Sequence, residues 1–108
     1  MIGVVMETIE LNALKKYSKE HPVKQLLHDS EHLRMALLCL EAGQEIVSHV
    51  APSTVMMQVL EGEGEFTVGQ EKKRGSEGSI FHCEPNVPHG IRALTRLSVL
   101  AVVAPRPE

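Results

Sequence analysis

Residues 43–62 read GQEIVSHVAPSTVMMQVLEG, and their counterpart, residues 78–93, reads GSIFHCEPNVPHGIRA. Both stretches combine strand-forming residues with Gly and Pro punctuation, a pattern typical of strands joined by short turns. Each carries a histidine, His49 in the first and His89 in the second. At neutral pH a histidine can ligate a metal, accept a proton or donate one. Two histidines that arrive from separate strands predict a site inside a β-structure.

Turn residues continue to recur at short intervals around these two stretches. The segments between them predict strands over residues 56–60, 66–68, 80–83 and 97–103. Short strands with closely spaced turns indicate an all-β sandwich or barrel. The basic triplet at residues 72–74 falls in a predicted hairpin, where we expect it to protect a sheet edge.

The first third of the chain is mixed in character. We expect a short strand over residues 4–9 and a brief helix or turn over residues 11–17, with Asn12 as a possible cap. Strands are then predicted over residues 23–28 and 32–40. The last of these is apolar on both faces, unlike a strand that has one face in water. One face should line the core, and the other should pack on a second sheet or on a partner subunit.

Composition excludes several classes of protein. With 108 residues, the chain is long enough for one domain with a real core. A net charge of −3 gives no basic surface for nucleic acid, and no apolar run approaches the roughly 20 residues that cross a bilayer. The first residues do not read as a signal peptide, so we expect a cytoplasmic protein. The two cysteines, Cys39 and Cys83, should be buried thiols in a reducing compartment.

The two histidine stretches resemble the paired motifs of the cupin superfamily. In the first motif, Gly43, His49 and the closing Gly62 stand at matching positions. In the second, Gly78 and the turn EPNVPH, which ends at His89, match the usual phrase. The turn has Asn86 where the family usually has Gly, and Asn tolerates the left-handed backbone that this position can require.

The resemblance implies a fold and covers about residues 33–103. It implies an all-β, cupin-type double-stranded β-helix (jelly-roll) barrel with a short N-terminal extension. We expect residues 1–108 to form a single domain. The excess of apolar strand surface also predicts a homodimer, since two-fold dimers are the commonest assemblies.

The resemblance also implies a metal site, which in this family usually has four protein ligands. Two of these four positions carry other residues in this sequence. His49 matches the first ligand and His89 the last, whereas Ala51 stands at the second histidine position. The glutamate position falls on Val55, or on Met56 if the spacing is one residue longer. Two imidazoles alone should bind a divalent ion (Zn, Fe, Mn or Ni) only weakly, because catalytic sites normally offer three protein ligands.

Other side chains near the motifs could complete such a site. Strand alternation predicts that His82 and Gln58 point away from the interior, and Glu84 should lie at the rim. Methionine together with histidine can bind copper(I), but Met57 and its neighbours are more simply core residues.

Four functions remain open at this point. The favoured one is a small-molecule-binding barrel, with His49 and His89 as polar anchors and an apolar lining from Ala51, Val55, Met57 and Phe81. The first alternative is a metal-dependent enzyme of dioxygenase or isomerase type that uses both histidines as ligands. The second is metal-free acid–base catalysis. The third is a pair of core histidines without a ligand, because cupins host many unrelated functions.

Overall fold

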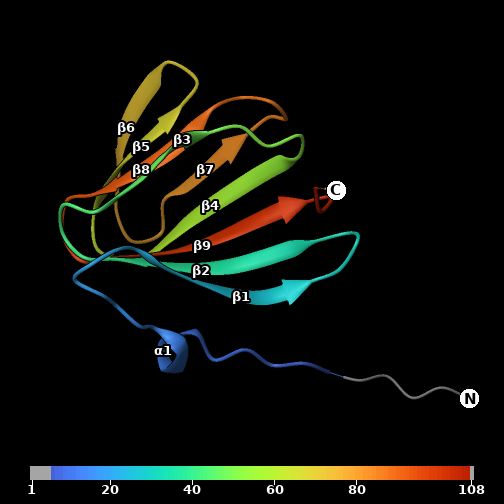
Figure 1. Ribbon diagram of the computed structural model, residues 1–108, viewed down its shortest axis with the longest axis horizontal. Helices are drawn as coiled ribbons and strands as arrows, with labels where there is room; N and C mark the ends of the chain where they lie inside the picture. The colour runs from blue at the N-terminus through green and yellow to red at the C-terminus, as the bar shows by residue number, and fades with distance from the viewer. Residues whose placement is uncertain (1–5, 108) are drawn as a thin grey trace, which may run out of the picture.

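A computed structural model describes residues 6–107 as two antiparallel β-sheets packed face to face (Figure 1). The larger sheet has the strand order β1-β2-β9-β4-β7, and the smaller has the order β3-β8-β5-β6. The bounds of the strands are β1 Val23–Asp29, β2 Arg34–Leu40, β3 Glu45–His49, β4 Thr54–Glu61, β5 Gly64–Val68, β6 Glu71–Gly75, β7 Ile80–Cys83, β8 His89–Ala93 and β9 Leu97–Ala104. The expected all-β double-stranded barrel is therefore confirmed.

The core lies between the sheets and follows the alternation of their strands. On β4, Val55, Met57 and Val59 are buried and point inward, while the residues between them face the other side. Leu97 and Val99 of β9 point the same way and are fully buried. Because successive side chains of a strand point to opposite faces, this alternation fixes one face of the larger sheet as the core face.

The two sheets touch most closely along the side where β5 faces β7. Phe66 of β5 is 1% exposed, and its ring stacks on that of Phe81 of β7 with 4.2 Å between ring centroids. Gly75 lies beside them, where a Cβ atom would come within 2.6 Å of the Phe81 ring. The opposite long side is bordered by the edge strands β1 and β3.

The second apolar face of β2 is covered by the chain itself. Leu37 and Cys39 are buried on this outer face, and the Tyr17 hydroxyl lies close to Ser98 of the neighbouring strand. The Gln25 side chain donates a hydrogen bond to the backbone oxygen of Leu14. The expected cover, a second sheet or a partner subunit, is thus corrected here: the segment before β1 contacts this face through Leu14 and Tyr17, and Figure 1 shows it running beside β1 on the side away from the smaller sheet. The homodimer stays a prediction.

An ionic cluster fastens this N-terminal segment at one end of the sandwich. Arg96 donates two hydrogen bonds to the Glu41 carboxylate, at 2.8 and 2.9 Å, in a bidentate ion pair. Its guanidinium also lies 4.3 Å from the centre of the Tyr17 ring. The Arg96 guanidinium lowers the pKa of Glu41, and burial raises the pKa of Tyr17. The segment is therefore attached by specific contacts and not only by apolar packing.

The N-terminal expectations need two corrections. Residues 4 and 5 of the expected first strand lie outside the described residues, and residues 6–9 form no strand. The helix α1, Leu11–Leu14, is shorter than expected, and Glu10 precedes it without a side-chain cap, so Asn12 is not its cap. No helix within residues 6–107 has the length and apolar character needed to cross a bilayer.

Candidate functional site

His49 and His89 meet at the junction of two neighbouring strands. His49 ends β3, His89 begins β8, and the two residues are direct partners in the antiparallel register. Their ring centroids are 4.4 Å apart, with the rings tilted by 59°. His89 is buried at 5% exposure, whereas His49 is exposed. The predicted convergence of the two histidines is present.

The hydrogen bonds of both rings determine which nitrogen is free. The Nδ1 atom of His49 lies 3.2 Å from the backbone oxygen of Val47, and that of His89 lies 3.1 Å from the backbone oxygen of Val87. A carbonyl oxygen can only accept, so each neutral ring carries its proton on Nδ1. Both Nε2 atoms are therefore left as acceptors.

Burial keeps His89 uncharged over a wider pH range. Burial lowers the pKa of His89, and the nearby His49 lowers it further, while the hydrogen bond to the Val87 carbonyl acts in the opposite direction. Near neutral pH the buried ring is thus a neutral acceptor.

Gly90 allows β3 to approach β8 closely beside this pair. A Cβ atom on Gly90 would lie 2.9 Å from the backbone nitrogen of Ser48 and 3.0 Å from the backbone oxygen of Ile46. Both are backbone atoms of β3, which could retreat only by moving the strand. The absence of a side chain at Gly90 therefore helps to set the distance between the histidines.

A cavity of about 110 Å³ lies between the sheets next to the histidine pair. Apart from both histidines and Gly90, its lining is mostly aliphatic: Ala36, Leu38, Ile46, Val55, Met57, Ile91, Ala101 and Val103. Lys24 and Arg34 complete it. A dry cavity of about 150 Å³ can hold a benzene molecule, so a single-ring ligand would fill this smaller space and extend toward its rim.

A comparison with known protein families shows which family the chain belongs to. The model of the Cupin domain matches residues 36–103, which contain both histidine motifs. This chain is a cupin. The match covers nearly the same part of the chain as the resemblance predicted from the motifs.

Solved structures of several other proteins are similar along almost the whole chain. The protein TT1209 from Thermus thermophilus is 32% identical, with a TM-score of 0.89, and the match covers 94% of this chain and 100% of that one. An RmlC-like cupin from Desulfovibrio desulfuricans is 31% identical, with a TM-score of 0.86 and coverage of 94% and 98%. A double-stranded β-helix protein from Klebsiella pneumoniae is 23% identical, with a TM-score of 0.85 and coverage of 94% and 91%, and shows the same fold. None of the curated proteins matches this cupin.

The cupin brings together four of the six predicted ligand-binding residues. His49, His89, Val55 and Met57 line the cavity, but Ala51 and Phe81 do not. Phe81 packs on Phe66 at the opposite side of the sandwich, because β7 is the far edge of the larger sheet. Ala51 precedes β4 and packs at the border of the core, where its carbonyl accepts a hydrogen bond from the Asn86 amide. These two positions are corrections to the predicted lining.

The residues predicted to face outward do so. His82 pairs with Met56 on the outer face of the larger sheet, and its side chain is 56% exposed. Gln58 lies on the same outer face, and Glu84 is exposed near His82. Asn86 has a φ angle of +67°, the left-handed conformation that the motif predicted for it.

Two cationic residues of the cavity were missed by the sequence reasoning. Lys24 belongs to β1 and Arg34 to β2, both upstream of the first motif. No sequence signal singled out Lys24, because its strand also contains the polar residues Gln25 and His28. Its position over the cavity depends on the pairing of β1 with β2, which the sequence does not fix.

The donor atoms present do not fit a tightly held metal. Among the described residues no group of three or more His, Cys, Asp or Glu side chains could hold an ion. Ala93, the last residue of the strand that His89 begins, is buried and has no ligating side chain. Two Nε2 atoms fall one short of the three protein ligands of a typical catalytic site. Weak binding of a divalent ion stays a prediction.

Acidification is expected to destabilise this cupin through His89. Because its pKa is lowered on folding, the unfolded chain binds this proton more readily than the folded chain. The free energy of unfolding should be highest above the unfolded pKa of about 6.5 and should fall as the pH drops toward the lower folded pKa. Urea unfolding at a series of pH values from about 7.5 to about 5 measures this dependence. His89→Gln should lose less stability over this range than wild type, and equal losses would contradict the assignment.

Proposed function

We propose that this cupin is a small-molecule-binding protein whose cavity holds a compact, largely apolar ligand against two histidines. The observation that carries the proposal is the lining: aliphatic side chains surround a cavity in which His49 and His89 offer two free acceptor atoms. Binding pockets are typically apolar with a few placed polar groups that orient the ligand.

The two histidines would give such a ligand its orientation. A neutral imidazole with its proton on Nδ1 accepts a hydrogen bond at Nε2. A hydroxyl or protonated group on the ligand could therefore donate to one ring or to both. The hydrocarbon part would then lie against Met57 and the aliphatic residues of both sheets.

Thermal unfolding with a panel of single-ring compounds, such as phenol, benzyl alcohol and benzoate, tests this proposal. A ligand at 100 times its Kd should stabilise the fold by about 2.7 kcal/mol, which raises the Tm by roughly 10–20 °C in a domain of this size. Ala101→Leu should abolish the rise, because Ala101 lines the cavity from the central strand β9 and the larger side chain would fill it.

His82→Ala is the matched control, since this histidine is exposed on the outer face of β7. It should leave the ligand-induced rise unchanged. A rise that persists in full in Ala101→Leu would place the ligand elsewhere and remove the proposal.

A further inference from the structure

We propose that the ligand of this cavity is an organic anion of the carboxylate class, whose charge is held by Lys24 beside edge strand β1. This inference rests on the proposed binding function and specifies the chemistry of its ligand. The first observation that supports it is the charge of the residues that line the cavity. The thirteen residues around the cavity include two permanent cations and two histidines but no carboxylate. In a chain whose net charge is −3, this is a local excess of positive charge.

Lys24 is placed where it can meet a ligand. It pairs with Leu38 across β1 and β2, so both side chains share the face that lines the cavity. Within residues 6–107 no carboxylate lies within 4.0 Å of its ammonium group. One side of the Lys24 side chain therefore faces apolar residues, and the other faces solvent. Its ammonium group has no carboxylate partner among the described residues.

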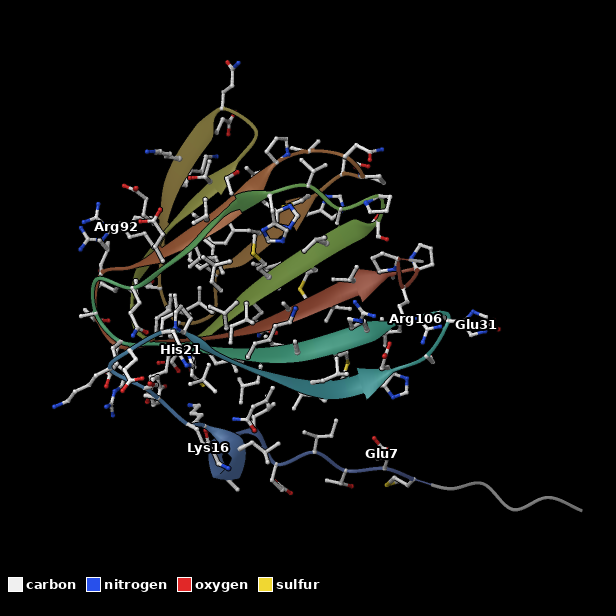
Figure 2. All side chains as sticks on the ribbon, in the orientation of Figure 1. Glu7, Lys16, His21, Glu31, Arg92 and Arg106 are labelled. Carbon is white, nitrogen blue, oxygen red and sulfur yellow. The ribbon has the colours of Figure 1, made fainter. Side chains whose placement is uncertain are left out.

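Arg34 adds to this charge at the end of the cavity near the β1–β2 turn. Its Nε atom lies 3.4 Å from Asp29 Oδ1, and the Arg106 side chain lies 3.4 Å from the same oxygen. One carboxylate is thus shared by two guanidinium groups, and among the described residues neither arginine has a second carboxylate within 4.0 Å. Figure 2 shows Arg106 at this end of the sandwich, where β9 ends, and Arg92 at the opposite end.

The aliphatic walls strengthen the attraction between such a cation and an anion. A charge pair beside low-dielectric surface interacts more strongly than one in bulk water. A carboxylate near Lys24 would keep its hydrocarbon part inside the cavity and its charge at the rim, where water still reaches it. Complete burial of the anion, with its large desolvation cost, is then avoided.

The test compares benzoate with benzyl alcohol, a neutral compound of similar size, by isothermal titration calorimetry. Wild type should bind benzoate about tenfold more tightly, the usual effect of one hydrogen bond to a charged group. Lys24→Met, which keeps a long apolar stem, should remove most of this preference and leave benzyl alcohol binding unchanged. Lys24→Arg should restore it, and Lys73→Met, a change of an exposed lysine on the outer edge strand β6, should have no effect.

Each other outcome overturns a distinct claim. If benzyl alcohol binds as tightly as benzoate to wild type, or if Lys24→Met weakens both equally, the anion inference is wrong while the binding function stands. If neither compound binds to wild type, the proposed function fails for ligands of this size, and the inference fails with it.

Discussion

Gly62→Ala is expected to destabilise the fold by about 2–6 kcal/mol, whereas Gly43→Ala should cost only about 1–3 kcal/mol. Both glycines have a left-handed backbone, with φ angles of +89° and +87°. They differ in their surroundings: a Cβ atom on Gly62 would lie 1.9 Å from the backbone oxygen of Arg96, but one on Gly43 would meet nothing within 4 Å. The backbone strain is thus common to both variants, and the steric overlap is unique to Gly62.

Urea unfolding of the two variants measures this difference, with the midpoint compared at an unchanged slope. Gly78→Ala is a second control, because Gly78 has a φ angle of +91° and also has no atom within 4 Å of an added Cβ. Equal losses in all three variants would show that backbone strain alone makes these motif glycines necessary. The close packing of the β4–β5 turn on residues 94–96 would then be incorrect.

Phe66→Ala should cost about 3–5 kcal/mol, the range for removal of a buried phenylalanine. Phe66 is 1% exposed and stacks on Phe81 across the two sheets, so the variant loses both the buried area and the aromatic contact. Small domains have only about 5–15 kcal/mol of stability in total, so this variant should be close to unfolding at room temperature.

Chemical unfolding of Phe66→Ala is best compared with Ile80→Ala. Ile80 precedes Phe81 on β7 but is 60% exposed, so its truncation should change stability by less than about 0.5 kcal/mol. A loss below about 1 kcal/mol in Phe66→Ala would mean that the contact between β5 and β7 contributes little to joining the sheets.

The fold class could be predicted because its signals are local. Turn residues and alternating apolar residues predicted β4, β5, β7 and β9, and Ile80–Cys83 was predicted with its observed bounds. The bounds of β6, Glu71–Gly75, were not predicted, since four of its five residues are exposed and show no alternation. It is a strand because β5 pairs with it, and pairing is a property of the assembled sheet.

The site could be predicted only in part for the same reason. His49 and His89 follow from motif spacing, and inward-facing Val55 and Met57 follow from alternation. Lys24 and Arg34 reach the cavity through the register of β1 and β2, which is not readable from either strand alone. Tyr17 and its segment cover the outer face of β2 through contacts that are distant in sequence, so the sequence pointed equally to a second sheet or a partner subunit.

The aromatic stack of Phe66 on Phe81 fastens one long side of the sandwich, and the cavity reaches the other side, where β1 and β3 each have a hydrogen-bonded neighbour on one flank only. We therefore expect the sandwich to open more easily along β1 and β3 than along the aromatic contact. A molecule slightly larger than the cavity would then be admitted by outward bending of β1 and β3, while the contact between Phe66 and Phe81 stays closed. For the ligand binding proposed above, size selectivity would then depend on how easily these edge strands bend more than on the shape of a rigid wall.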